Sequence, residues 1–251
     1  MVVSLLAALL ALLAVLLAWP LPNWLAGAAW PSRQPRRAIA LWQAIGLSGG
    51  FAAVGSLLLL GFDPLGPDWT LLNLAGLAGA AILLAWLLGV LITNTVRIER
   101  QLNRQRDAVD LLAWIDLDGV RVLDHPEPAA YCLPGPRPRI VVTHGAIASL
   151  GPEELAAVLA HERAHAVGRH ELIIQPFVAW ESALPFLPPA RRATAAVAEL
   201  VEMLADDHAA RETSPRALAR ALAQVGSDRL PSAPDGTAQA SVLPRVRRLV
   251  Q

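Results

Sequence analysis

Two histidines and a glutamate within residues 150–169 have the types and the spacing of a metal site. The segment reads L-G-P-E-E-L-A-A-V-L-A-H-E-R-A-H-A-V-G-R, and His161, Glu162 and His165 form an H-E-x-x-H motif in it. A helix advances about 100° per residue, so side chains four apart lie on one face, one turn above the other. Two neutral imidazoles placed in this way can bind one Zn²⁺, and the neighbouring carboxylate can deprotonate a water that the metal activates. We therefore expect Glu162 to be a general base.

The residues around the motif predict the helix that this chemistry needs. Gly151 and Pro152 stand at its start, and the first turn carries two carboxylates, which the helix dipole favours there. No helix breaker follows until Gly168. The simple alternative is a chance pattern on an Ala/Leu-rich helix with surface His and Glu. With six histidines in the chain, such a match has a probability on the order of 1%, so we favour the metal site.

A catalytic zinc usually takes three protein ligands and a water, so the motif needs one more residue. The predicted helix at 190–210 carries Glu202 and Asp206, which are four apart and therefore on one face. Glu202 would coordinate the zinc, while Asp206 would accept the second N–H of a ligating histidine and fix its tautomer. The alternative is a set of charges on an exposed helix face, which the H-E-x-x-H motif disfavours. Glu199, about one turn earlier, is the reserve ligand.

The overall composition indicates a membrane protein. Hydrophobic residues make up 55% of the chain, charged residues only 17%, and the mean hydropathy is positive. A formal net charge of zero gives no reason to expect a nucleic-acid partner. The single cysteine, Cys132, excludes an internal disulfide and is most simply a buried small hydrophobe.

Three apolar stretches predict transmembrane helices at about 2–19, 38–60 and 70–93. Each is long enough to cross roughly 30 Å of hydrocarbon at about 1.5 Å per residue. The first stretch has the alternative of a signal peptide, but it lacks a positive n-region and a clean cleavage site. Gly46 and Gly50 form a small-x-x-x-small pair, for which we expect close helix packing.

The arginines between the apolar stretches predict the orientation. The loop at 31–37 and the segment at 97–106 are rich in Arg, whereas the loop at 61–68 carries two Asp and no Arg. Under the positive-inside rule the first two are cytoplasmic and the third is external. We therefore expect a multi-pass protein of the cell membrane with its N-terminus outside and the H-E-x-x-H helix facing the cytoplasm.

The charge content rises after the third stretch, which divides the chain into a transmembrane region at 1–96 and a water-facing domain at 97–251. Short strands are predicted at 120–123, 129–133 and 139–143, separated by Pro and Gly. An edge strand beside such a motif helix can hold an extended peptide by backbone pairing. The strand at 139–143 is the candidate, and a structural hairpin is the alternative. The expected fold is mostly α, with three transmembrane helices followed by an α+β zincin-like domain.

The segment at 172–188 is apolar but interrupted by polar residues and prolines, so it is marginal for a bilayer crossing. A single crossing would put His161 and Glu202 on opposite membrane faces, although one zinc must touch both. We therefore expect an interfacial or re-entrant segment, or a helical hairpin that returns to the same side. The metal site would then lie close to the membrane. A buried core helix without membrane contact is the alternative.

The C-terminal residues predict a short helix, a loop and a basic end. Ser214 and Pro215 have the types of an N-cap and a first helical residue, and this helix should run to about residue 225. Residues 227–241 form a Pro/Gly/Ser-bearing loop. The final cluster would contact anionic lipid, or it would be a solvated helix face; its members are Arg245, Arg247 and Arg248.

These motifs together resemble the BlaR/MecR-type integral membrane zinc metallopeptidases, which are gluzincins, and more distantly the Ste24/HtpX-like peptidases. The resemblance rests on the N-terminal spans, on P-R-I-V-V-T-H-G-A-I-A-S-L-G-P-E-E-L-A-A-V-L-A-H-E-R-A-H, and on V-E-M-L-A-D-D downstream. It implies that His161, His165 and Glu202 bind one zinc ion. It also implies that Glu162 is the general base and that Asp206 supports the ligands from outside. We interpret His170, in the H-x-x-x-x-H continuation, as structural.

We therefore expect a membrane-embedded zinc metalloendopeptidase in which Glu162 passes the proton of the water to the leaving amine. Its partners would be a protein or peptide substrate and the lipid bilayer, and the resemblance implies regulatory cleavage of a cytoplasmic transcriptional repressor. Antibiotic sensors of this type carry a further span and an external penicillin-binding domain, which this sequence does not show, so drug sensing by this chain alone is not expected. The alternatives are a signalling or scaffold protein with a structural zinc site, and a membrane protein whose motif binds no metal. Candidate oxyanion donors are His208, Tyr131 and Arg211.

Overall fold

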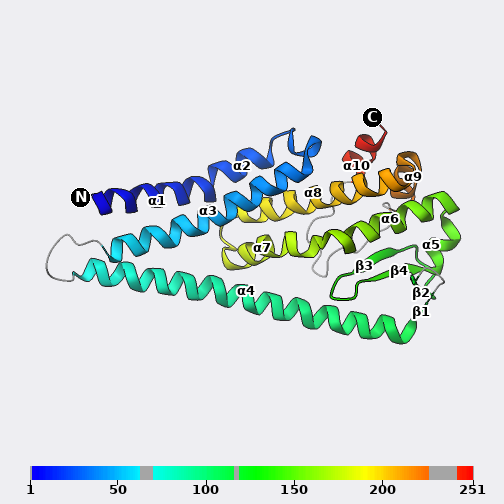
Figure 1. The fold of residues 1–251 in the computed structure, drawn as a ribbon, viewed down its shortest axis with the longest axis horizontal. Helices are drawn as coiled ribbons and strands as arrows, with labels where there is room; N and C mark the ends of the chain where they lie inside the picture. The colour runs from blue at the N-terminus through cyan, green and yellow to red at the C-terminus, as the bar shows by residue number, and fades with distance from the viewer. Residues whose placement is uncertain (1, 63–69, 116–118, 226–241, 251) are drawn as a thin grey trace. The chain divides into compact units, whose positions relative to one another are not determined.

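The computed structural model describes residues 2–62, 70–115, 119–225 and 242–250 (Figure 1). It is mostly α-helical with one small sheet, as predicted. The chain divides into two compact units. The first contains Met1–Thr95 and Gln175–Val197, and the second contains Val96–Ile174 and Ala198–Gln251.

The first unit is built on long apolar helices. These are α1 (Val2–Ala18), continued by the short α2 (Pro20–Ala26), then α3 (Pro35–Gly61) and the first part of α4 (Leu71–Leu112). Helices α1 and α3 lie side by side (Figure 1). Three stretches are long and apolar enough to cross a membrane, Val2–Ala26, Pro35–Gly61 and Leu71–Leu112, which agrees with the three predicted spans. Most of the acidic loop predicted at 61–68 lies outside the described residues.

The segment predicted at 172–188 forms a helical hairpin. Helix α7 (His170–Ala183) is followed after a short turn by α8 (Pro188–Glu212). Two hydrogen bonds join residues 175–197 of this hairpin to the rest of the first unit. Gln175 Nε2 donates to Thr95 Oγ1 at 2.7 Å, and Trp86 Nε1 donates to the Ala183 carbonyl at 3.1 Å. A helical hairpin is one of the predicted forms, and its relation to the membrane stays a prediction.

The Gly46/Gly50 pair of α3 receives an aromatic ring. A Cβ at Gly46 or at Gly50 would lie 3.6 or 3.5 Å from the indole of Trp180, which is in ordinary van der Waals contact. The two glycines therefore provide a flat surface for Trp180 of α7.

The second unit contains a four-stranded sheet in the order β1-β2-β4-β3. Its strands are β1 (Trp114–Ile115), β2 (Arg121–Leu123), β3 (Ala130–Leu133) and β4 (Arg139–Thr143). Strand β2 runs parallel to β4, and the other two pairs are antiparallel. The last three strands match the predicted ones, whereas the two-residue strand β1 was not predicted.

The prediction that 139–143 is an edge strand is wrong. Strand β4 pairs with β2 on one side and with β3 on the other, so it is internal, and β3 is the edge strand beside it. Its two consecutive valines, Val141 and Val142, are both buried, which is typical of a strand covered on both faces. Strands β3 and β4 form the antiparallel hairpin that was the alternative.

The H-E-x-x-H helix is α6 (Pro152–Gly168), which follows the short α5 (His144–Ser149). The Gly151 N–H donates to the Glu154 carboxylate at 2.7 Å, which gives a partner to one backbone donor that has none within the helix. One side of α6 packs on the sheet through Val158, which shares a cluster with valines of β2 and β4. Another side packs on α9 (Pro215–Val225) and α10 (Val242–Leu249). The motif is therefore held in the core of this unit.

Helix α9 confirms the prediction made from Ser214 and Pro215. It begins at Pro215 and ends at Val225, and the Ser214 hydroxyl accepts from the Ala217 N–H at 3.4 Å. The loop predicted at 227–241 lies outside the described residues. Val246 and Leu249 of α10 pack against the core formed by α6 and α9.

Candidate metal centre

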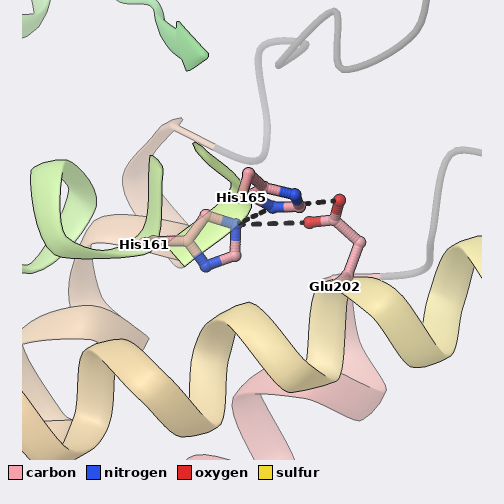
Figure 2. Close-up of side chains that lie close together, drawn as sticks. All are labelled: His161, His165 and Glu202. Carbon is pink, nitrogen blue, oxygen red and sulfur yellow. Dashed lines mark hydrogen bonds and ion pairs between the residues drawn. The ribbon is translucent and has the colours of Figure 1, made fainter. Parts of the chain in front are cut away.

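Three predicted ligands meet at one point. His161 and His165 project from α6, and their Nε2 atoms are 3.1 Å apart. Figure 2 shows the Glu202 carboxylate reaching them from α8. Its Oε2 lies 3.4 Å from His161 Nε2, and its Oε1 lies 3.6 Å from His165 Nε2. The reserve ligand Glu199 is not part of this group.

The geometry of the group fits zinc. Bonds of 2.0–2.1 Å at tetrahedral angles place neighbouring ligand atoms about 3.3 Å apart. The separations of 3.1, 3.4 and 3.6 Å lie around this value, although the last two involve different oxygens of one carboxylate. Two imidazoles and a carboxylate are a donor set that zinc accepts, and three ligands leave a fourth position for a reacting molecule. The residues present therefore suit a catalytic ion.

Asp206 lies behind His161, at the place expected for a residue that orients a ligand. Its Oδ1 is 3.0 Å from His161 Nδ1, and the aspartate is buried. Burial alone would lower the pKa of His161, but the neighbouring Asp206 and Glu202 carboxylates raise it to about 10. Burial alone would raise the pKa of Asp206, but Arg245 and His161 lower it. The two side chains thus favour each other's charged form.

Arg245 is a part of this site that the sequence analysis missed. Its Nε and Nη2 donate to the two carboxylate oxygens of Asp206, both at 2.7 Å, and its Nη1 lies 3.0 Å from Glu202 Oε2. The side chain is 5% exposed. The prediction that this arginine contacts lipid or solvent is therefore wrong, because α10 docks on α8 with Arg245 facing inward.

A sequence signal for Arg245 existed in the pattern of α10. Val242, Val246 and Leu249 follow a helical spacing that forms one apolar stripe, and position 245 falls within that stripe. An arginine inside an apolar stripe predicts a buried charge with an acidic partner. Of its neighbours, Arg247 is exposed, and Arg248 pairs with Asp207 of α8 at 2.6 Å.

Glu162 is buried beside the ligands and interacts with the sheet. Burial is the main reason that its pKa is raised to about 7. The backbone N–H of Cys132, on edge strand β3, faces its carboxylate and partly offsets this rise in pKa. Burial also raises the pKa of the Cys132 thiol to about 12, so this cysteine is a poor nucleophile. A carboxylate that ionises near neutral pH has the property that a general base needs.

The three oxyanion candidates lie outside the group of ligands. His208 pairs with Glu212 one turn further along α8, at 3.0 Å. Tyr131 packs beside Leu133 and Val141 of the sheet. Arg211 lies in the last turn of α8. The identity of the oxyanion donor stays a prediction.

The second unit contains a buried H-E-x-x-H helix whose histidines meet a glutamate from a second helix, and the chain also has long apolar helices. This combination is typical of membrane-associated metallopeptidases. Residues 94–187 match the model of Peptidase family M48. This segment is less than half of the chain; it contains the H-E-x-x-H motif and ends before Glu202. The match confirms the resemblance to membrane zinc metallopeptidases at the level of family M48, while the BlaR/MecR subtype stays a prediction. No curated protein and no solved structure matches the chain.

Proposed function

We propose that the chain is a zinc-dependent metalloendopeptidase of the membrane, with Glu162 as its general base. The observation that carries the proposal is the convergence of His161, His165 and Glu202, whose ligand atoms lie within 4.8 Å of one another. The match to a peptidase family over the same helix supports it. Bound zinc would supply Lewis-acid chemistry, making a water acidic near neutral pH and polarising the carbonyl of the scissile bond.

The protein's own residues would handle the proton. Glu162 accepts it from the attacking water on its carboxylate and then delivers it to the leaving amine. A pKa of about 7 lets one group do both near neutral pH. The Cys132 N–H orients this carboxylate, while Asp206 and Arg245 fix the positions of His161 and Glu202.

Edge strand β3 is the proposed binding site for an extended substrate. The Thr143 N–H donates to the Ala129 carbonyl at 2.9 Å, so these residues form a hydrogen-bonded pair next to the β3–β4 ladder. Antiparallel pairs alternate, so the backbone groups of Ala130 and Cys132 point to the outer side of β3. A peptide that paired along this side would run past Glu162, and its backbone would compete with the Glu162 carboxylate for the Cys132 N–H.

A cytoplasmic substrate follows from the proposed orientation in the cell membrane. The arginines of the 31–37 segment support a cytoplasmic position for this segment and for the H-E-x-x-H helix, and the N-terminus would be external. A transcriptional repressor is the substrate that the resemblance implies. Single cysteines placed at residue 2 or in the 31–37 loop should be labelled differently by a membrane-impermeant reagent in intact cells. We expect only the first to react, and the opposite result would reverse the orientation.

Glu162→Gln tests the mechanism, with Glu153→Gln as the matched control on the same helix. The Glu153 side chain is 78% exposed, so its substitution should leave the site intact. Purified chains would be compared for zinc content and for cleavage of casein. We expect Glu162→Gln to keep its zinc and to lose about 10²–10⁴-fold in rate, and Glu153→Gln to keep both.

Three results would contradict the proposal. Cleavage by zinc-loaded Glu162→Gln at the wild-type rate would refute the role of this glutamate. Stoichiometric zinc in a wild-type chain that cleaves no peptide would favour a structural site in a signalling or scaffold protein. Wild-type protein that holds no more zinc than His165→Ala would show that the motif binds no metal.

A further inference from the structure

The second ring nitrogen of His165 has a partner that the proposed mechanism does not use. His170 Nδ1 lies 3.0 Å from His165 Nδ1. The two rings meet edge to face, with centroids 4.8 Å apart and an interplanar angle of 84°. His170 is buried, with 7% of its surface exposed. Because His170 is the first residue of α7, the contact is made across the junction between two helices.

The junction is shaped so that His170 folds back onto α6. Arg169 has φ 45° and ψ 48°, a left-handed conformation that residues other than glycine rarely adopt. Gly168 leaves space for the imidazole, since a Cβ there would stand 2.6 Å from Cδ2 of His170. The left-handed C-cap ends α6 at Arg169, and Gly168 leaves the space that the His170 ring occupies.

Coordination through Nε2 and this contact together fix where the protons of both rings reside. His165 Nε2 faces His161 Nε2 and the Glu202 carboxylate, at 3.1 and 3.6 Å. An imidazole that coordinates through Nε2 carries its proton on Nδ1. Two facing Nδ1 atoms form a hydrogen bond only if one donates and the other accepts. His170 must therefore accept through Nδ1 and carry its own proton on Nε2.

We propose that His170 is a positioning residue, which holds His165 in the Nδ1–H tautomer and fixes the orientation of its ring. It does for His165 what Asp206 does for His161, where a carboxylate oxygen lies 3.0 Å from the outer nitrogen. The proposal rests on the proposed function, because the tautomer matters only if His165 coordinates a metal.

The choice of an imidazole here has a physical reason. Glu162, Glu202 and Asp206 already bring three carboxylates to the centre, and Arg245 brings one guanidinium. A fourth carboxylate behind His165 would add a buried negative charge without a partner, which is costly. A neutral imidazole provides the acceptor without adding charge.

The test compares His170→Phe, which keeps a ring but removes the acceptor, with His170→Asn, whose Oδ1 can replace Nδ1 as acceptor. His125→Phe, at an exposed histidine of the same unit, is the matched control. Zinc dissociation constants would be measured on the full chain by competition with a chromophoric chelator. We expect a rise of about 10–100-fold for His170→Phe, a value close to wild type for His170→Asn, and no change for His125→Phe. The visible absorption of Co²⁺-loaded protein should shift in the first variant only.

Equal zinc affinity in His170→Phe and wild type would overturn the proposal. Equally weak binding in His170→Phe and His170→Asn would also overturn it, since ring packing alone would then explain the effect. If His170→Phe does not fold, Gly168→Ala serves instead, because its Cβ displaces the His170 ring; unchanged zinc affinity there overturns the proposal. Zinc-loaded wild type without peptidase activity would refute the proposed function and leave this inference standing, whereas absence of zinc binding would refute both.

Discussion

Arg245→Met removes the guanidinium that joins α10 to two acidic residues of α8, while it keeps a long unbranched side chain. The three contacts of 2.7, 2.7 and 3.0 Å are almost free of solvent, because the side chains of Arg245 and Asp206 are 5% and 1% exposed. Breaking a buried ion pair by removing one partner costs about 3–5 kcal/mol, since the other charge stays buried. An exposed pair would cost only about 0–1 kcal/mol. We therefore expect the free energy of unfolding to fall by about 3–5 kcal/mol.

The measurement is denaturant or thermal unfolding of the full chain in detergent micelles, followed by circular dichroism. Arg247→Met is the control, because it makes the same exchange at an exposed position two residues along the same helix; its effect should stay within about 0.5 kcal/mol. Adding Asp206→Asn to Arg245→Met removes the unpaired carboxylate, so the double variant should be less destabilised than the sum of the two single ones, by about 0.5–3 kcal/mol. A loss in Arg245→Met no larger than that in Arg247→Met would show that α10 does not dock on α8 through this arginine.

Three further predictions concern the same fold. The pKa of Asp206 is lower in the folded than in the unfolded chain, so the stability that it contributes is present above about pH 4 and is lost as the pH falls further. Below about pH 4, the melting temperature of wild type should therefore drop more steeply than that of Asp206→Asn. Parallel curves would contradict this prediction. The buried Thr143 hydroxyl accepts from the amides of Ala129 and Ala146, so Thr143→Val should cost about 1–3 kcal/mol of unfolding free energy, and an unchanged midpoint would argue against it. Trp180→Ala should remove the ring that packs on the Gly46/Gly50 surface and lower the unfolding free energy by less than the about 3–5 kcal/mol of a fully buried tryptophan, because Trp180 is only partly buried; an unchanged midpoint would contradict this packing.

The parts of the site that the sequence predicts are those fixed by the geometry of a single helix. His161 and His165 share a face because they are four residues apart, and the same holds for Glu202 and Asp206. Joining the two pairs needed the rule that a catalytic zinc takes three protein ligands, and the E-x-x-x-D spacing and the family resemblance favoured Glu202 over Glu199. In the structure these four residues lie together, as this reasoning predicts.

The order of the strands is not predictable in this way. The R-I-V-V-T sequence of β4 shows that the strand is buried, but it does not say which strands lie beside it. In the structure β2 pairs with β4 in parallel, so β4 becomes internal and the edge passes to β3. Pairing between strands depends on contacts distant in sequence, and a one-sequence pattern contains little information on them. The sequence pattern therefore favours β4 as an edge strand, whereas in the structure β3 lies at that edge.

The charges around the centre explain why a third helix belongs to it. Glu162, Glu202 and Asp206 are three carboxylates in one largely buried cluster, and Arg245 neutralises one of them. Without Arg245, Asp206 would be a buried carboxylate without its guanidinium partner, which is strongly unfavourable. The arginine of α10 therefore allows α8 to carry two largely buried carboxylates, Glu202 and Asp206, one turn apart.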